Sequence, residues 1–386
     1  MSPVATPVSP FPATYMVFLT LRCPLRCEYC FVRKEDDDMS ASTASRFVDF
    51  AMSHQVSGPH YHVNICFFGG EPFLCIERMS QIVNEARHPR PNVYKTPVFT
   101  ATTSGVIATP EVERVVKDAH MSLLISLDGD LVASRSRPLA SGRDSYPVVA
   151  RNLPRLVSWT HEAVVRMTFH PGSLDLVSNV RHALELGAPS VALCPVEEVP
   201  WETHEAALEE SYQALADWYI EEARRGTILP LEITHLLLAS WHAAQHGAPR
   251  PARPCGVGTS LLGVAPNGQV LPCHRFIHRR QDALGHVSDD ALRGDRSRYL
   301  HLASSRLLGC DQCSARQVCG GGCRAVVLEQ GGDFKTGTTP GYCVTTRAHH
   351  RAVVHIYDTL MAEGNPAFLR ILNRSRSSPL TALYTQ

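Results

Sequence analysis

Three cysteines near the start of the chain share one short loop. Cys23, Cys27 and Cys30 follow the apolar run 15–20 at the spacing C-x3-C-x2-C. Soft thiolates suit iron–sulfur clusters or zinc, and a closed structural zinc site needs a fourth ligand nearby. No fourth ligand follows at usable spacing, so a four-iron cluster held here would keep one iron open for a small molecule. A zinc knuckle is the competing interpretation.

A second and larger group of cysteines lies in the C-terminal half of the chain. Its spacing is C-x12-G-x4-C, then C-x2-C-x5-C-x3-C, then one last cysteine. One or two zinc ribbons are the alternative, but seven cysteines joined to the N-terminal loop favour iron–sulfur clusters. The members are Cys255, Cys273, Cys310, Cys313, Cys319, Cys323 and Cys343.

The first loop resembles the signature of the radical S-adenosylmethionine (SAM) enzymes, and the second group matches the pattern of their SPASM extension at every spacing. The resemblance implies that SAM chelates the open iron. One electron then cleaves SAM to methionine and a 5′-deoxyadenosyl radical, which abstracts hydrogen from a substrate. It also implies three [4Fe-4S] clusters, one that binds SAM and two auxiliary ones.

By the same resemblance the SPASM cysteines form two ligand sets. The outer cluster would use Cys310, Cys313, Cys319 and Cys343. The inner cluster would use Cys255, Cys273 and Cys323. Some relatives add an eighth cysteine shortly before the first of these, and segment 246–254 of this chain has none. One iron of the inner cluster is therefore without an assigned ligand, and a substrate thiolate, water, a small thiol or an unidentified side chain could bind it.

Other segments resemble the SAM-contacting parts of the family. Gly-Gly-Glu-Pro at 69–72 follows the second predicted strand, and an aromatic residue precedes the third cysteine. Ser104 stands where many relatives have asparagine, so we expect it to contact SAM less directly. Arg135 and Arg137 compete with Arg166 for the SAM carboxylate, and no catalytic residue is assigned. The implied contacts are Tyr29, Gly69, Gly70, Glu71, Pro72, Ser104, Ser126, Asp128 and Arg166.

The elements that must position these residues alternate between short β-rich runs and longer amphipathic stretches. We predict strands at 15–20, 62–68, 97–102, 122–127, 164–169 and 190–193. We predict helices at 40–54, 73–87, 109–120, 145–159 and 174–186, with Ser40 and Thr109 as N-caps. Six β/α units predict an α/β fold with a parallel sheet and right-handed crossovers. A partial (β/α)6 TIM-type barrel is the core that the resemblance implies, with its site at the C-terminal strand ends.

The same pattern predicts the domain organisation. We expect a flexible segment at 1–14, the barrel with bridging helices at 15–235, a small cysteine-rich SPASM domain at 236–349 and a helical tail at 350–386. A Pro-rich linker at 247–254 would enter the SPASM region. Two bridging helices are predicted at 205–225 and 235–246. The apolar face of the first is formed by Leu208, Tyr212, Leu215, Trp218, Tyr219 and Ala223.

Composition excludes several classes of protein. Lys+Arg and Asp+Glu both number 37, so no basic footprint favours nucleic acid or an anionic membrane surface. No run approaches the roughly eighteen apolar residues of a membrane span, and no signal peptide is recognisable. We therefore expect a cytoplasmic protein. In that compartment thirteen cysteines fit metal ligation better than disulfides.

The expected function is a radical modification of a ribosomal peptide or protein that forms a thioether or carbon–carbon crosslink. The alternative is an anaerobic sulfatase-maturing, formylglycine-generating enzyme. In those enzymes an aspartate base follows the second SPASM cysteine, and this chain has His274 there. A third hypothesis is a metal-binding scaffold that does not cleave SAM.

The expected partners follow from the same reading. The substrate is a peptide or small protein, and flavodoxin or ferredoxin is the expected class of electron donor. Fourteen residues precede the first strand, which leaves no room for a leader-binding domain of ordinary size. Leader recognition is therefore expected to use the barrel surface or a separate protein.

Overall fold

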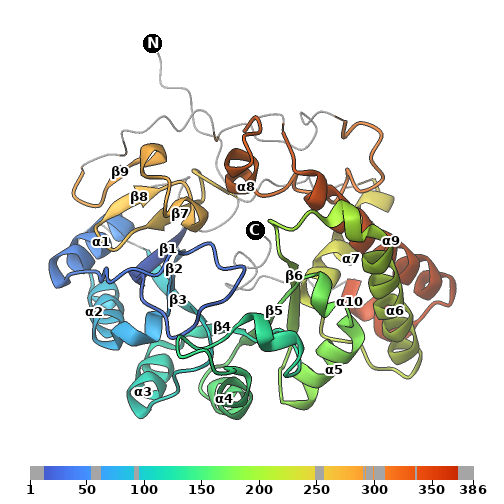
Figure 1. Cartoon of the computed structure of the whole chain (residues 1–386), viewed down its shortest axis with the longest axis horizontal. Coiled ribbons are helices and arrows are strands. Elements are labelled where there is room, and N and C mark those ends of the chain that lie inside the picture. The colour runs from blue at the N-terminus through green and yellow to red at the C-terminus, as the bar shows by residue number, and fades with distance from the viewer. Residues whose placement is uncertain are drawn as a thin grey trace. The chain divides into compact units, whose positions relative to one another are not determined.

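The computed structural model describes residues 13–53, 62–90, 95–247, 256–289, 292, 299, 309–334 and 337–372 (Figure 1). The chain forms two compact units, each built from several segments. The first unit comprises Met1–Ser126, Ser136–Ala163 and Gly256–His301, and the second comprises Leu127–Arg135, Val164–Cys255 and Leu302–Gln386. The domain bounds at 235 and 349 stay predictions, and segments 1–12, 248–255 and 373–386 lie outside the described residues.

The first unit is organised around β1 (Ala13–Thr20), which lies between β2 (His62–Gly69) and β7 (Leu261–Val264) and runs parallel to both. Strands β3 (Thr96–Thr103) and β4 (Ser122–Ser126) continue the parallel sheet beyond β2. Strands β8 (Gln269–Leu271) and β9 (Gly285–His286) add antiparallel pairs beyond β7. Residues 15–19 are at most 1% exposed. A central parallel strand is covered on both faces, which explains why this run is uniformly apolar.

Three helices connect the parallel strands of this unit: α1 (Ala41–Ser53), α2 (Ile76–Arg87) and α3 (Pro110–Ala119). A fourth, α4 (Tyr146–Ser158), follows β4. Figure 1 shows α1, α2 and α3 on the outer side of β1 to β3. The short helix η1 (Pro72–Cys75) precedes α2. Both predicted N-caps are confirmed, since the Ser40 and Thr109 hydroxyls accept from Thr43 N (3.1 Å) and Val112 N (3.4 Å).

The second unit contains the parallel pair β5 (Ala163–Phe169) and β6 (Val191–Pro195), followed mainly by helices. The first three are α5 (Leu176–Glu185), α6 (Glu205–Arg224) and α7 (Glu232–Gln245). The last three are α8 (Arg324–Glu329), α9 (Pro340–Ala362) and α10 (Pro366–Leu372). Helix α9 packs along α6 and α7.

The predicted α/β pattern is confirmed. All six strands and the five helices between them occur within a few residues of the expected bounds, and both bridging helices are present as α6 and α7. Five of the six residues of the predicted apolar face of α6 are buried, and Trp218 is half-buried. The Arg181 guanidinium lies over the Trp218 ring, 5.1 Å from its centre.

Buried polar groups lie where α6, α7 and α9 meet. The Tyr212 ring stacks on the His349 ring at 4.7 Å between centres, and His349 Nε2 is 3.0 Å from the Thr234 hydroxyl. Burial, and after it the neighbouring His350, lowers the pKa of His349 to about 3. The native protein therefore holds this imidazole neutral at pH values where an unfolded chain would protonate it.

This difference predicts a loss of stability in mild acid. Between pH 6.5 and 3 the unfolded state binds a proton at His349 that the native state does not, so stability falls as pH falls. The expected cost is about 1.4 kcal/mol per pH unit below the unfolded pKa. Urea unfolding at pH 7 and pH 5.5 measures it. His349→Phe should reduce the difference, whereas His161→Gln, at an exposed position, should leave it. An unchanged pH dependence in His349→Phe would contradict the assignment.

Candidate functional site

The loop that carries the first three cysteines connects β1 to α1, and its base is closed. Leu21 N donates to Asp37 O (2.9 Å). Arg22 Nε donates to Asp38 Oδ1 (3.0 Å), and the Thr20 hydroxyl donates to the same carboxylate (2.5 Å). Burial acts to raise the pKa of Asp38, but the bonds from Arg22 and Thr20 outweigh it and lower the pKa. The charged Asp38 carboxylate thus links the start of the loop, at Thr20 and Arg22, to its end.

The three thiols project from this closed loop in a half-buried setting. Cys30 N donates to Cys27 O (3.2 Å), which turns the chain between these two residues. Lys34 Nζ donates to Cys30 Sγ (2.9 Å). Burial, followed by the charge of Glu71, raises the pKa of Cys23 to about 12. A thiol in this environment ionises only beside a cation, so the loop suits iron ligation better than free thiolates.

The Gly-Gly-Glu-Pro turn after β2 lies directly against the base of this loop. Gly70 N donates to Thr20 O, and Glu71 N donates to Arg22 O, both at 2.9 Å. Gly69 has a φ of +133°, and a Cβ at this position would lie 2.3 Å from Thr20 O. A Cβ on Gly70 would lie 2.0 Å from Arg22 O. The two glycines are therefore required for the backbone of the turn to reach the loop.

The Glu71 side chain points into the protein and joins the turn to the end of β3. Its carboxylate is fully buried and accepts from the Thr103 hydroxyl (2.9 Å), Ser104 N (2.7 Å) and Phe73 N (3.2 Å). The Ser104 hydroxyl also donates to it. Burial raises the pKa of Glu71 in spite of these bonds. Sequence reasoning had grouped Glu71 and Ser104 as contacts to SAM, and the structure brings them into contact with each other.

Three other predicted residues belong to the first unit. Tyr29 and Ser126 are half-buried, and Pro72 is buried at the start of η1. Arg137, a competitor for the SAM carboxylate, is 2% exposed and donates to Ser104 O (3.3 Å). Arg137 thus lies next to the Glu71 network.

Asp128 and Arg166 belong to the second unit. Asp128 is 1% exposed, and its Oδ1 accepts from Thr168 N (3.0 Å) on β5. Arg166 Nε is buried without a hydrogen-bond partner among the described residues. Burial raises the pKa of the Cys194 thiol, and the Arg166 guanidinium acts against that rise. The predicted SAM contacts are thus divided between the two units, and the complete set stays a prediction.

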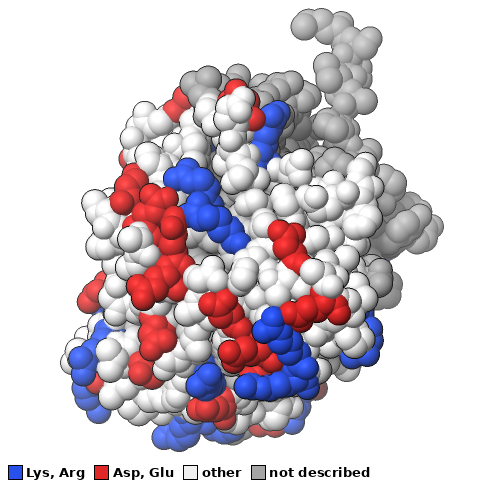
Figure 2. Space-filling view, turned by 90° about the vertical axis from the view of Figure 1, so that its right-hand side faces the viewer, with Lys and Arg blue, Asp and Glu red and all other residues white. Residues whose placement is uncertain are grey.

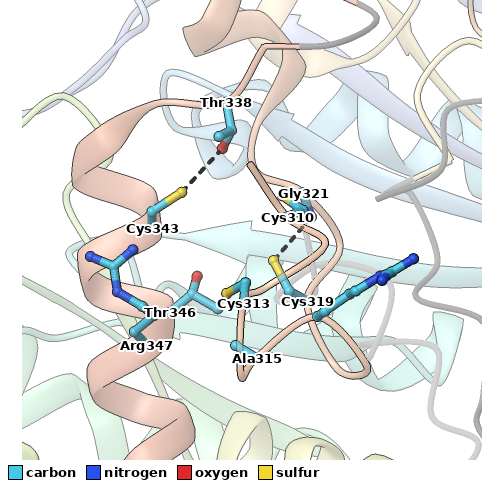
Figure 3. A pocket seen from close by; sticks show the side chains of 10 residues that line it. Cys310, Cys313, Ala315, Cys319, Gly321, Thr338, Cys343, Thr346 and Arg347 are labelled. Atoms are coloured by element: carbon cyan, nitrogen blue, oxygen red, sulfur yellow. Dashed lines mark hydrogen bonds between the residues drawn. The ribbon is translucent and has the colours of Figure 1, made fainter. Parts of the chain in front are cut away.

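A pocket in the second unit is lined by the four cysteines predicted for the outer cluster (Figure 3): Cys310, Cys313, Cys319 and Cys343. Cys343 on α9 faces the loop that carries the other three thiols. Gly321 N donates to Cys319 Sγ (3.3 Å), and the Thr338 hydroxyl lies 3.7 Å from Cys343 Sγ. Four thiols with hydrogen-bond donors around one open space fit a cluster.

Two arginines, Arg316 and Arg347, also line this pocket. Burial raises the pKa of Cys310, the nearby Cys343 and Cys313 raise it further, and Arg316 acts in the opposite direction. Arg316 therefore favours the thiolate form of Cys310. Among the described residues, no three His, Cys, Asp or Glu side chains form a group that could hold one metal ion.

Two of the three predicted inner ligands fall within the described residues, and Cys255 lies outside them. Cys273 belongs to the first unit, and Cys323 belongs to the second, where it precedes α8. Cys323 is not among the residues that line the outer pocket. The three inner ligands stay a prediction.

His274, which follows Cys273, packs against the first cysteine loop within the first unit. Its ring centre is 5.6 Å from that of Phe31 and 5.0 Å from that of Phe68. Four residues later, His278 Nε2 accepts from Arg33 N (2.9 Å). The segment that carries the second SPASM cysteine and the loop that carries Cys30 are therefore in direct contact.

Several residues of both cysteine sites were missed by sequence reasoning. Lys34 contacts the first loop, and Arg316, Thr338 and Arg347 line the outer pocket. A sequence signal exists for three of them. Lys34 follows Cys30 by four residues, Arg347 follows Cys343 by four residues, and Arg316 lies between Cys313 and Cys319. Nothing local identifies Thr338.

The surface agrees with the balanced composition. Figure 2 shows acidic and basic side chains interspersed over the face that it draws, without one continuous basic patch. Among the described residues, no helix combines the length and apolar character that crossing a membrane requires.

Comparison with known proteins agrees with this arrangement. Residues 13–147 match the family described as a 4Fe-4S single cluster domain. The PqqA peptide cyclase of Methylorubrum populi is 24% identical over 343 residues, which cover 86% of this chain and 85% of the relative. The serine-type anaerobic sulfatase-maturating enzyme of Klebsiella aerogenes is 23% identical over 324 residues, which cover 78% of this chain and 77% of that enzyme.

Solved structures show the same fold. Native anSMEcpe with bound AdoMet superposes with a TM-score of 0.72 at 15% identity, covering 94% of this chain and 99% of that one. Streptococcus suis SuiB bound to its precursor peptide SuiA gives a TM-score of 0.57 at 15% identity, covering 86% and 76%. These matches indicate the same family as the three-cysteine loop, the glycine turn bonded to it and the SPASM spacing do. The comparisons therefore support the resemblance to the radical SAM/SPASM family of peptide- and protein-modifying enzymes.

Proposed function

We propose that this protein modifies a ribosomal peptide or small protein by radical chemistry and forms a thioether or carbon–carbon crosslink. The observation that carries the proposal is the packing of the glycine turn 69–72 against the loop of Cys23, Cys27 and Cys30. When bound, the [4Fe-4S] cluster and SAM supply a 5′-deoxyadenosyl radical that abstracts hydrogen from the substrate. The relatives named as PqqA peptide cyclases support a peptide substrate.

Within this function we assign separate roles to the residues around the first loop. The backbone of Gly69, Gly70 and Pro72 would meet the amine of SAM, while the buried Glu71 carboxylate holds this turn against Ser104. Tyr29 would pack near the adenine. In the second unit, the buried and unpartnered Nε of Arg166 supports a bond to the SAM carboxylate.

Ser126 and Asp128 are proposed to contribute on the ribose side of SAM. The bond from Thr168 N to Asp128 Oδ1 (3.0 Å) occupies part of that carboxylate. Asp128 would therefore act mainly by holding the turn after β4, and Ser126 would make the direct contact. No residue is assigned as a catalytic acid or base.

We further propose two auxiliary clusters, which would accept the electron that oxidative ring closure releases. The outer one would be held by Cys310, Cys313, Cys319 and Cys343, supported by the pocket that these thiols line. The inner one would be held by Cys255, Cys273 and Cys323. Its fourth iron would be open to an added ligand, and soft iron prefers a thiolate to water there.

Iron analysis tests the cluster count. The anaerobically reconstituted protein should bind on the order of twelve irons per chain, since the cysteines provide ligands for three four-iron clusters. Cys319→Ala combined with Cys343→Ala should remove about four irons, because the outer pocket loses two ligands, yet 5′-deoxyadenosine should still form. Saturation of the unmodified protein at about four irons would contradict the auxiliary clusters.

The second candidate function is formylglycine formation. It is favoured by the similarity to the serine-type anaerobic sulfatase-maturating enzyme. The presence of His274 rather than aspartate after the second SPASM cysteine weakens it. The His274 ring contacts Phe31 and Phe68, and the residue is 7% exposed.

One assay separates the candidates. The reconstituted protein is incubated with SAM, dithionite and either synthetic peptides encoded beside its gene or a sulfatase peptide. If the protein forms crosslinks, 5′-deoxyadenosine should accumulate and the peptide encoded beside its gene should lose two hydrogens. The product should not react with hydroxylamine. A hydroxylamine-reactive aldehyde in the sulfatase peptide would support the alternative. The absence of 5′-deoxyadenosine from a fully iron-loaded protein would favour an idle scaffold.

We also propose partners and a location. A low-potential flavodoxin or ferredoxin would deliver the electron, and a separate leader-binding protein would present the substrate. The many cysteines predicted as iron ligands favour the reducing cytoplasm.

A further inference from the structure

We propose that Lys34 sets the reduction potential of the first cluster through a charged hydrogen bond to the Cys30 ligand. The inference deepens the proposed function and rests on it, because Cys23, Cys27 and Cys30 must hold that cluster. Lys34 would act as a positioning residue, since it acts through a ligand and touches no substrate.

The geometry fixes the ammonium group at the loop. Lys34 Nζ lies 2.9 Å from Cys30 Sγ and 3.0 Å from Val32 O. Val32 is 3% exposed and Lys34 is half-buried. An ammonium group with two fixed acceptors differs from a mobile surface lysine, because its charge stays next to the same sulfur.

Reduction makes such a charge important. The cluster takes up one electron from a low-potential one-electron donor, no bond forms or breaks, and its net charge becomes more negative by one. A cation and a hydrogen bond at a ligand sulfur stabilise the more negative state, and both raise the reduction potential of an iron–sulfur centre. Partial burial limits the screening of this interaction by water and salt.

The same loop contains a matched control. Arg33 precedes Lys34 and is exposed, and its backbone N donates to His278 Nε2. Replacing its side chain removes one positive charge from the loop but no bond to a cysteine. Solvent should screen that charge, so its removal should affect the cluster much less than the removal of the Lys34 charge.

The experiment is a redox titration followed by electron paramagnetic resonance, with dithionite as the reductant. The signal of the first cluster is identified by its change on addition of SAM. Lys34→Met should lower the ratio of reduced to oxidised cluster about tenfold at a fixed solution potential, about 59 mV for a one-electron couple. Lys34→Arg should retain most of the original potential, and Arg33→Gln should change it little.

Equal potentials in Lys34→Met and the unmodified protein, with equal iron content, would overturn the proposal. If Lys34→Met does not assemble the cluster, the reduction potentials of Lys34→Gln and Lys34→Arg are compared instead. Equal potentials in these two variants would overturn the proposal. Failure of the proposed function looks different. In that case the SAM-responsive signal would be missing from the unmodified protein, or would persist after replacement of all three loop cysteines.

Discussion

Replacing Cys23, Cys27 and Cys30 together with alanine should abolish reductive cleavage of SAM. These thiols share one closed loop, and the glycine turn that would meet SAM is bonded directly to its base. Without them no iron can be held where that turn could position a ligand. The measurement is 5′-deoxyadenosine formation from SAM and dithionite, which should fall to the level of a protein-free control.

The matched control for this variant is the Cys319→Ala, Cys343→Ala double variant, which removes thiols from the outer pocket instead. Each variant should lose about four irons, but only the loop variant should lose SAM cleavage. Continued accumulation of 5′-deoxyadenosine in the loop variant would show that the radical chemistry had been assigned to the wrong cysteines.

Gly70→Ala should lower SAM cleavage by at least about 100-fold without removing a single ligand atom. The new Cβ would lie 2.0 Å from Arg22 O and 2.8 Å from Leu21 O. Both atoms belong to the backbone that begins the cysteine loop, so relief requires the turn and the loop to separate. Displacement of a binding group by about 1 Å is enough for a loss of this size. Initial rates and SAM affinity, measured on protein with matched iron content, test it.

Gly226→Ala is the control for the effect of replacing a glycine by alanine away from the cysteine loop. Gly226 has a φ of +86° but open space around its Cβ position, so alanine there costs about 1 kcal/mol of backbone strain and touches no site. SAM cleavage should be unchanged in this variant. Equal activities of Gly70→Ala and the unmodified enzyme would mean that the turn does not hold SAM.

The secondary structure could be predicted because its signals are local. Thr109 followed by Pro110 begins α3 as expected, since a capping hydroxyl and a fixed φ act within one turn. The parallel strands could be recognised because burial on both faces requires apolar side chains along the whole strand. The neighbour that covers Trp218 could not be predicted in this way. The Arg181 guanidinium on α5 lies over its ring, and periodicity along α6 carries no information about that neighbour.

The cysteine spacing by itself determined that this chain is built to hold iron–sulfur clusters. Thiolate chemistry depends on residue type, and a short loop keeps ligands together whatever surrounds it. Only the tertiary structure decided which groups act on those ligands. Lys34 Nζ reaches Cys30 Sγ because a side chain folds back over the loop. Cys343 and Arg347 line the outer pocket because α9 packs beside the loop that carries Cys310. The Glu71 carboxylate accepts hydrogen bonds from Thr103 and Ser104, more than thirty residues away. Such contacts depend on how distant segments pack, and local sequence cannot specify that packing.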